Sequence, residues 1–598
     1  MDSDATGTLD VAPAAAVVTR APLTRIERRR STRRSGVAFL PWVVGLVTLA
    51  LRLLAAASGP TDWDSAQYAS AVGHYDVTHG QPQPPGYWLY VISGRLIHQL
   101  TGLGTIHSLV LVAAVASAVA AGLTTVAGTD LGGRWVGVAA GAVVATCPFA
   151  WFSGSIVATY SFDMVGCSLL VILAWRARPR SWHGVAAVVA LGLLAGFRQS
   201  MIQSFAVLAL IPVVASTRRW GRLGVTVVAG AAAVGVWLIP MSMSQPGGFS
   251  AWLRATRIET DGAAQATSVL DHAAGGATNL GTFAAFTLVA LAPVAVLALL
   301  AGVVLAIRAL VGRSDGNDSA RGLEVEAAVG PVVEWSRPWY QQRSAVLGAA
   351  IVPPMLLVAL VQFAKGGYLL AYLPAVVIAL LLPVGALNRP RGEGREVSPV
   401  WLVVTTVGVI AVVALGSQRF LSGDGVLPES LLRSSGPVWL EQPRYQAPYA
   451  DTRPAIQSID AIDAAMRGLG PAVHPDRDVV VFDTYDGGGN IYRNAGWELP
   501  ADRIALIQPN GILYNEWHGA LYYASGATVQ VGPGGSVLLV ASPALPGLAA
   551  LAAGGHLTPV PTPRPIGGYR VWRVSPGFSV LGVRVVETAG PRPLGTGI

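Results

Sequence analysis

Hydrophobic and polar positions divide the chain into two regions. Between residues 37 and 415, long apolar segments recur, and short polar stretches separate them. An apolar helix of about 20 residues crosses the hydrocarbon core of a bilayer, where backbone polar groups must be satisfied inside the helix. After residue 416 the apolar runs are shorter and alternate with Gly and Pro. The pattern predicts a mainly α-helical, polytopic membrane protein with a C-terminal domain of a different kind.

We predict about eleven transmembrane helices from the apolar segments. They cover residues 37–57, 106–128, 135–152, 156–175, 181–197, 201–215, 223–239, 283–307, 345–363, 368–387 and 400–415. Another apolar and aromatic segment, 88–100, is too short to cross a bilayer and carries polar residues at intervals. We expect it to lie flat at the membrane interface, after the rigid turn formed by Pro84, Pro85 and Gly86.

The arginines indicate which loops are cytoplasmic, because short cytoplasmic loops collect basic residues. If the first span runs from inside to outside, the inner loops hold Arg134, Arg176, Arg178, Arg180, Arg218, Arg219, Arg222, Arg308, Arg313, Arg389, Arg391 and Arg395. The same rule makes 181–215 a hairpin, because arginine clusters at both of its ends require an even number of crossings. Arg198 is then at the outer tip of this hairpin, and everything after residue 415 is extracytoplasmic.

The two ends of the chain differ from the middle. Residues 1–36 lack periodicity and carry an arginine cluster, which predicts a disordered basic cytoplasmic tail. The first apolar run is too long for the hydrophobic region of a signal peptide, so we expect it to be retained as the first span. Residues 417–598 combine a helical pattern after Pro454 with strand patterns at 479–483, 503–508, 536–542 and 569–574. These patterns predict an extracytoplasmic α/β domain.

Charge and cysteine content exclude some partners and some kinds of site. The formal net charge is +8, but no basic helix alternates with stacking aromatic residues, so nucleic acid is excluded as a partner. We attribute the positive charge to orientation in the membrane. Cys147 and Cys167 fall in apolar segments and are predicted to be small buried hydrophobic residues, not a disulfide or a metal site.

The outer loop 58–105 concentrates ionisable residues in a chain of which only 12% is charged. It contains Asp62, Asp64, His74, Asp76 and His79. Other outer segments contribute Tyr160, Asp163, Arg198, Trp252, Arg254, Arg257, Glu259 and Lys365. We therefore expect an outward-facing site with carboxylates on one side and cations on the other. The two histidines are read as solvated loop residues, because no tight cluster of metal ligands surrounds them.

Three short motifs in these outer segments carry a family resemblance. They are DSAQY at 64–68, QPPGYWLY at 83–90 and ATYSFD at 158–163. Their order resembles the acidic element, the His-Pro-Pro type turn and the second acidic loop of GT-C fold glycosyltransferases, which include the protein O-mannosyltransferases and the lipid A aminoarabinose transferases. The resemblance covers residues 37–415 in topology. Gln83 stands where many relatives have His, and an amide can form hydrogen bonds but cannot act as a base.

The resemblance implies a reaction and a location. Such enzymes take a sugar from a polyprenyl-phosphate donor and attach it, with inversion, to a hydroxyl of a glycan, lipid or protein acceptor outside a bacterial plasma membrane. A carboxylate must accept the proton of the attacking hydroxyl, and cations must balance the departing phosphate. We expect Asp64 to be the base, with Asp62 as its alternative or helper, and Asp163 to orient the acceptor or a metal. A divalent cation is left open.

Cations and aromatic residues of the same segments are the candidates for substrate binding. The phosphate candidates are Arg52, Arg198 and Lys365, and the remaining candidates are Tyr68, Gln83, Tyr87 and Tyr368. Each has a structural alternative. Asp62, Asp64 and Asp163 could only cap or begin helices. Arg52 and Lys365 could be interfacial anchors, and Arg198 could be a solvated hairpin tip.

Two other function classes remain open, a transporter or flippase for a lipid-linked or small solute and a catalytically silent relative that acts as a binding partner. A transporter favours broken helices with charges near the midplane, whereas the ionisable residues here gather at the outer ends of spans. In the C-terminal domain, segments 483–493 and 514–523 concentrate Tyr, Trp, Asp and Asn. They suit carbohydrate binding, and an ordinary core and turn is the alternative.

Overall fold

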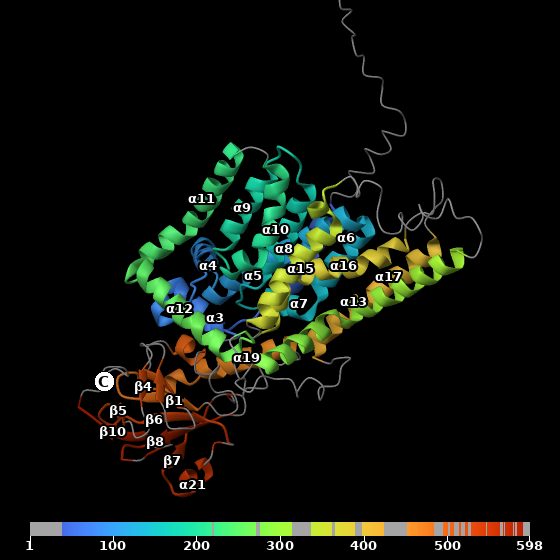
Figure 1. Ribbon diagram of the computed structural model, residues 1–598. Coiled ribbons are helices and arrows are strands. Elements are labelled where there is room, and N and C mark those ends of the chain that lie inside the picture. The colour runs from blue at the N-terminus through green and yellow to red at the C-terminus, as the bar shows by residue number, and fades with distance from the viewer. Residues whose placement is uncertain are drawn as a thin grey trace, which may run out of the picture. The chain divides into compact units, whose positions relative to one another are not determined.

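The computed structural model describes most of the chain. The described residues are 39–61, 63–217, 220–270, 276–313, 337–361, 365–388, 398–423, 451–483, 494–499, 503–507, 513–515, 521–523, 528–543, 545, 547–562, 566, 569–577, 579–580 and 583–589. Helices fill the first two thirds, and a domain of strands and helices follows (Figure 1). The predicted N-terminal tail and Asp62 lie outside the described residues.

A helix occupies each predicted span. The helices are α2 (Leu40–Leu53), α5 (Thr105–Gly132), α6 (Arg134–Thr146), α7 (Pro148–Ser155), α8 (Ser161–Arg176), α9 (His183–Leu194), α10 (Ser200–Ser216), α11 (Trp220–Ser244), α13 (Gly276–Arg313), α15 (Arg343–Leu360), α16 (Leu373–Ala386) and α17 (Pro399–Ser422). The segments between them form α3 (Trp63–Gly73), η1 (Val77–His79), α4 (Trp88–Thr101), α12 (Gly248–Thr267), η3 (Trp339–Gln341) and η4 (Gly366–Ala371). The short aromatic segment is therefore a separate helix, α4, as predicted.

Helix length limits how many of these elements cross a bilayer alone. Among the described residues, five helices are long and apolar enough: α5, α11, α13, α15 and α17. The bent pair α6 and α7, with an angle of 61°, adds a sixth if it counts as one span. The other apolar helices, including α2, α9, α10 and α16, are shorter. The structure thus confirms the apolar helices, and the number of eleven crossings stays a prediction.

The outer surfaces of several long helices are apolar. On α11, α13 and α17 large hydrophobic side chains are exposed, for example Val228, Leu299 and Val400. Water would not stabilise such continuous apolar surfaces, whereas lipid chains would. These faces fit direct contact with the hydrocarbon core of a membrane.

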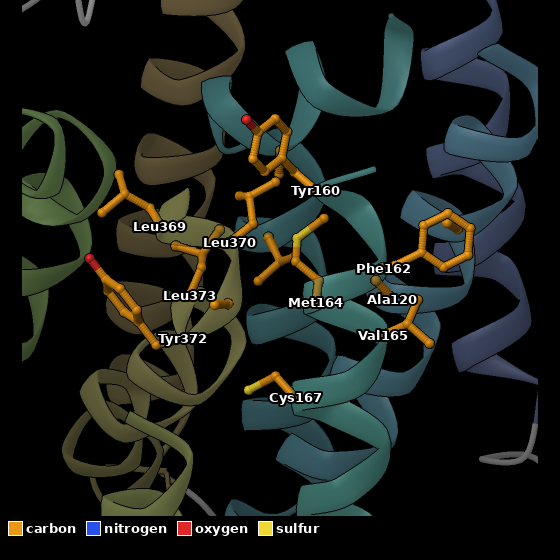
Figure 2. Close-up of a cluster of buried hydrophobic side chains, with 14 of the residues drawn as sticks. Ala120, Tyr160, Phe162, Met164, Val165, Cys167, Leu369, Leu370, Tyr372 and Leu373 are labelled. Atoms are coloured by element: carbon orange, nitrogen blue, oxygen red, sulfur yellow. The ribbon is translucent and has the colours of Figure 1, made fainter. Parts of the chain in front are cut away.

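Helix α8 lies inside the helical bundle. Its residues are buried along nearly the whole length, and it packs against α5, α9, α10, α15 and α16. Met164 of α8 lies on the side of the helix that faces Leu370 of η4 and Leu373 of α16 (Figure 2). Phe162 and Val165 lie on the other side of α8, with Ala120 of α5. This packing fixes the first turn of α8, which carries Asp163, against η4.

The two ends of α8 distinguish the two sides of the bundle. At its last residue, Arg176 pairs with Asp130 of α5 at 2.6 Å. At its first turn, Asp163 faces Arg198, which follows α9 and precedes α10. Residues 181–215 therefore form a hairpin with Arg198 at the tip, as the arginine pattern predicts. Cys147 and Cys167 are buried free cysteines, also as predicted.

The C-terminal part contains two sheets. One has the strand order β4-β3-β2-β1-β6-β8-β7, and the other has the order β5-β10-β9. The strands are β1 (Val479–Asp483), β2 (Arg503–Ile507), β3 (Leu513–Asn515), β4 (Leu521–Tyr523), β5 (Thr528–Val531), β6 (Val537–Ala541), β7 (Leu557–Pro559), β8 (Arg570–Val574), β9 (Ser579–Val580) and β10 (Val583–Glu587). Strand β1 pairs in parallel with both β2 and β6. The predicted helix and all four predicted strand patterns are present.

The larger sheet has apolar side chains on both faces, because alternate residues of a strand point to opposite sides. In β1, Val479 and Val481 belong to the cluster that includes Leu548 of α21 (Leu548–Ala553). Val480 and Phe482 belong to the cluster that includes Met466 of α19 (Arg453–Arg467). The C-terminal part thus has α/β layers, which explains why the central strand β1 is apolar at four consecutive positions, Val479 to Phe482.

Asp463 of α19 is fully buried, and its Oδ1 accepts a hydrogen bond of 2.8 Å from Nδ2 of Asn494. Burial raises the pKa of Asp463 to about 8, and the negative charge of Glu498 adds to the effect. The carboxyl group is therefore protonated at neutral pH in the folded protein, whereas in the unfolded chain it ionises near 3.8.

The raised pKa predicts how stability depends on pH. Between about pH 4 and pH 8 the folded state binds the extra proton, so the stability contribution of Asp463 falls as pH rises, by at most about 1.4 kcal/mol per pH unit. Asp463→Asn removes this titration while retaining the oxygen acceptor. We expect its Tm relative to the wild type to increase between pH 5 and pH 8, measured by thermal unfolding in detergent. The exposed Asp476→Asn variant is the control, and a difference in Tm that does not change with pH would contradict the prediction.

Candidate active site

Asp64 and Lys365 form an ion pair at one end of the bundle. Asp64 lies in the first turn of α3, and Lys365 directly precedes η4, 301 positions later in the chain. Nζ of Lys365 donates to Oδ2 of Asp64 at 2.8 Å, and both side chains are 21% exposed. Asp64 therefore binds a cation from a distant segment in addition to beginning a helix. The ion pair is partly exposed, so a ligand can reach it.

A second ion pair joins Asp163 and Arg198. Nε of Arg198 lies 3.0 Å from Oδ2 of Asp163, and the two side chains are 7% and 4% exposed. The guanidinium carbon of Arg198 lies 4.3 Å from the ring centre of Tyr160 and 5.0 Å from that of Tyr368. Arg198 is thus buried, not a solvated hairpin tip, and it is held by a carboxylate and by cation–π contacts with two tyrosines.

Aromatic contacts connect the two ion pairs. Tyr68, one turn after Asp64 on α3, packs edge-on against Tyr87 and Tyr90, with ring centres 5.2 Å apart in each case. The rings of Tyr160 and Tyr368 also pack against each other, with ring centres 5.4 Å apart. Thr159 accepts a hydrogen bond of 3.4 Å from Nη1 of Arg198. The predicted residues Asp64, Tyr68, Tyr87, Asp163, Arg198, Lys365 and Tyr368 therefore belong to one cluster, which we call the charged cluster.

Gly367 permits the close approach within the sequence KGGY. A Cβ atom at Gly367 would lie 2.4 Å from the ring of Tyr160, too close for any larger residue. The absence of a side chain lets η4 pack directly on the tyrosine that covers Arg198. The glycine therefore explains how Lys365 and Tyr368, on either side of it in sequence, both reach the same cluster.

The Pro-rich turn before α4 is held from two directions. The carbonyl oxygen of Pro85 accepts hydrogen bonds from Nε1 of Trp252 at 2.8 Å and from Nε2 of Gln199 at 3.4 Å. Tyr87 follows with a φ of 44°, in the left-handed region that non-glycine residues rarely adopt. Oε1 of Gln83 is buried and has no hydrogen-bond partner within the described part of the chain. The turn thus places a strained tyrosine and an unsatisfied amide oxygen near one another in the sequence.

Asp76 organises the rest of the loop. It accepts hydrogen bonds from the Thr78 hydroxyl at 2.6 Å and from Nε2 of Gln245 at 2.9 Å, and it pairs with Nδ1 of His79 at 2.6 Å. Burial opposes ionisation, but these hydrogen bonds lower the pKa of Asp76 below its usual value. Both His74 and His79 are exposed, as expected, and His79 is in addition bonded to a carboxylate of the loop. The interactions of Asp76 with Gln245 tie η1 to the segment that follows α11.

The contacts of Arg52 lie outside the charged cluster. It is fully buried near the end of α2, and its guanidinium donates to Oγ of Ser117 at 3.0 Å and to the carbonyl oxygen of Ala145 at 2.7 Å. Its guanidinium carbon also lies 5.4 Å from the ring centre of Trp151. These contacts join α2 to α5, α6 and α7. The guanidinium of Arg52 therefore does not extend to the membrane interface, and its contacts with these helices are not contacts with the charged cluster.

Within the described residues no group of three or more His, Cys, Asp or Glu side chains is placed to hold a metal ion. Asp64 and Asp163 each pair with a cation instead. The divalent cation that the sequence left open stays open.

Sequence reasoning missed some residues of the site. Thr159 and Gln199 contact the charged cluster or the Pro-rich turn, and Gln245 binds Asp76. Gln199 directly follows Arg198, and Thr159 lies inside the ATYSFD motif, so proximity in sequence could have identified both. Gln245 lies 169 positions from Asp76, and no local pattern connects the two.

Comparisons with known proteins give structural neighbours. No family model matches the chain, and no curated protein matches it. The similar solved structures include ArnT from Cupriavidus metallidurans bound to undecaprenyl phosphate, with a TM-score of 0.48, 13% identity and coverage of 89% of this chain and 97% of that chain. They also include the oligosaccharyltransferase AglB from Archaeoglobus fulgidus in complex with an inhibitory peptide and a dolichol-phosphate, with a TM-score of 0.38, 12% identity and coverage of 79% and 64%.

Both neighbours are glycosyltransferases of the GT-C fold, the group that the sequence motifs resemble.

The buried pair predicts a specific pattern of stability. Asp163→Asn leaves the charge of Arg198 buried without its carboxylate, which typically costs about 3–5 kcal/mol. Replacing both residues, as Asp163→Asn with Arg198→Gln, removes the uncompensated charge and should recover part of the loss. Thermal unfolding of the purified protein in detergent measures each effect.

The matched control is Asp130→Asn, which breaks the more exposed pair with Arg176 and should cost less than about 1 kcal/mol. If Asp163→Asn were no more destabilising than this control, the pair would not hold the site together.

Proposed function

We propose that this chain is a membrane glycosyltransferase that transfers a sugar from a polyprenyl-phosphate donor to an acceptor hydroxyl on the outer face of a bacterial plasma membrane, with inversion. The observation that carries the proposal is the accessible ion pair of Asp64 and Lys365 beside the buried pair of Asp163 and Arg198. One cluster then contains a carboxylate for the attacking hydroxyl and cations for the departing phosphate. Such a combination suits group transfer from a phosphate carrier.

In the proposed reaction Asp64 is the general base. The acceptor oxygen attacks the anomeric carbon of the donor while its proton passes to a carboxylate oxygen of Asp64. The bond between the anomeric carbon and the phosphate oxygen breaks, and the polyprenyl phosphate leaves with the electron pair. Attack from the side opposite to the leaving group inverts the anomeric configuration. Asp62, which lies beside Asp64 in sequence, is retained as the alternative base or helper.

The cations have different tasks because of their different surroundings. Arg198 is fixed by Asp163, Tyr160 and Tyr368, so it supplies a positive charge in a constant position. Lys365 is partly exposed, and its flexible side chain binds Asp64 in the absence of substrate. A donor phosphate would compete with Asp64 for the ammonium group. Donor binding would then release the carboxylate to accept a proton from the acceptor.

The surrounding residues suit a sugar. The partly exposed rings of Tyr87 and Tyr368 offer apolar surface and hydroxyl groups, which is the combination that binds sugar faces and edges, and the buried ring of Tyr68 packs against Tyr87. The buried Oε1 of Gln83 needs a hydrogen-bond donor, and a sugar hydroxyl can supply one. In this proposal Asp163 acts through Arg198 and orients the substrate without taking part in proton transfer. Both structural neighbours hold a lipid phosphate, undecaprenyl phosphate in ArnT and a dolichol-phosphate in AglB, which is the carrier class proposed for the donor here.

Replacing Asp64 provides the main test. Asp64→Asn keeps the shape of the side chain but removes the proton acceptor, so we expect transfer to fall by about 10²–10⁴-fold. The measurement is transfer of labelled sugar from polyprenyl-phosphate sugars by the purified protein in liposomes.

Asp261→Asn, at an exposed position of α12, is the control and should retain wild-type transfer. Full transfer by Asp64→Asn would remove Asp64 as the base. Solute uptake by the wild type without any transfer would instead favour a transporter.

Lys365 tests the role assigned to the phosphate. Lys365→Met removes the ammonium group, so we expect the KM for the donor to rise by about tenfold or more, whereas Lys365→Arg should retain part of the donor affinity. The same liposome assay, with donor concentration varied at a fixed acceptor concentration, measures the change. An unchanged KM for the donor in Lys365→Met would contradict phosphate binding by this residue.

A further inference from the structure

The segment that leads into α3 is bound by residues of the C-terminal domain. Oδ1 of Asp460 accepts hydrogen bonds of 3.0 Å from the backbone N–H groups of both Ser58 and Gly59. Nδ2 of Asn494 donates a hydrogen bond of 2.8 Å to the carbonyl oxygen of Pro60. Residues about 400 positions apart in the chain are therefore joined through the backbone just before the acidic motif.

We infer that the C-terminal domain positions the base Asp64 by binding residues 58–60, an inference that rests on the proposed function. The contact, which we call the 58–60 latch, consists of Ser58, Gly59, Pro60, Asp460, Asp463 and Asn494. In this role Asp460 and Asn494 are positioning residues that act through the backbone and do not touch the substrate.

The latch satisfies the polar backbone groups of this segment. The N–H of Ala57 donates to the carbonyl oxygen of Ser155 at 2.8 Å, so the segment is fixed to the end of α7 before it reaches the latch. Pro60 has no N–H, and its carbonyl oxygen is bound by Asn494. A backbone fixed at consecutive residues has little freedom in direction. Asp64 follows only four positions after Pro60.

Helix α19 is built to contact two partners at once. Ile462 and Met466 pack toward the large sheet, whereas Ile456 belongs to the apolar core of the helical bundle. Asp460 and Asp463 lie one and two turns after Ile456 on a helix with 3.6 residues per turn, so they share its side of the helix. The acidic residues are thus held against segment 58–60 by apolar contacts with both partners.

Gly59 shows how close the contact is. A Cβ atom at this position would lie 2.0 Å from Oδ2 of Asp463 and 2.8 Å from its Cγ. Oδ1 of the same carboxyl group accepts from Asn494, which also binds Pro60. Only glycine lets the backbone approach Asp463 this closely. The contact with Asp463 therefore requires glycine at position 59.

The consequence for catalysis is geometric. A base that is displaced by about 1 Å from the acceptor hydroxyl can lose about 100-fold in rate. Loss of the latch would leave Arg198 and Asp163 in place, since neither belongs to it. A shift of Asp64 would loosen only its bond to Lys365, which donor binding is itself proposed to break. The latch should therefore affect the turnover number and leave donor binding nearly unchanged.

The first experiment measures the contact itself and needs no activity. Hydrogen–deuterium exchange of full-length protein in detergent reports directly on the amides of Ser58 and Gly59. We expect faster exchange of these amides in Asp460→Ala, an intermediate rate in Asp460→Asn, which keeps one acceptor oxygen, and no change in Gln457→Ala, at an exposed position of the same helix. Unchanged exchange in Asp460→Ala would overturn the latch.

The second experiment measures the positioning role in the liposome transfer assay. We expect kcat to fall by about tenfold or more in Asp460→Ala, with the KM for the donor within about twofold of the wild type, and partial rescue by Asp460→Asn. Faster exchange combined with an unchanged kcat would overturn the positioning role. If the wild type transfers no sugar, the proposed function fails, while hydrogen exchange still decides whether the latch exists.

A third arm covers the outcome that Asp460→Ala does not fold. Gly59→Ala should lower kcat because its new methyl group displaces Asp463, and the loss should be smaller in an Asp463→Ala background, where the opposing carboxyl group is gone. Equal losses in both backgrounds would show that residues 59 and 463 do not act through this contact. Thermal unfolding of each variant shows whether it remains folded during the assay.

Discussion

The buried ion pair between Asp163 and Arg198 is the interaction on which the arrangement of the site depends. Charges inside an apolar bundle are stable only when a partner of opposite charge and further polar contacts compensate for the lost water. That requirement brings the first turn of α8, the tip of the α9–α10 hairpin and the start of η4 together, because Tyr160, Tyr368 and Thr159 all contact Arg198. The more exposed pair of Asp64 and Lys365 is assembled beside this fixed point.

The two ion pairs differ in how far solvent and ligands can reach them. Arg198 is enclosed and its position is constant, which suits an electrostatic task that requires no movement. Lys365 and Asp64 are partly exposed, so a ligand can separate them. In the proposed function, a preorganised cation next to a replaceable one would let the same cluster bind a phosphate and activate a hydroxyl. The 58–60 latch adds an external constraint on the helix that carries the carboxylate.

Several features could be predicted from local sequence. The apolar segments, the separate aromatic helix α4, the α9–α10 hairpin and the strand patterns of the C-terminal domain are all present. The number of crossings could not be settled, because α2, α9, α10 and α16 are shorter than a spanning helix and their role depends on packing. Arg52 could not be placed from its position near the end of a span, since its partners Ser117 and Ala145 lie on other helices.

The sequence by itself determined the class of elements and the kinds of side chain available for chemistry, because hydropathy periods and turn residues are local properties. Only the tertiary structure decided which of those side chains meet. The pairing of Asp64 with Lys365, the enclosure of Arg198 by two tyrosines, and the binding of Ser58 and Gly59 by Asp460 all join distant segments. In each contact, a charge or a backbone polar group that is shielded from water needs a partner, and the tertiary structure determines which residue supplies that partner.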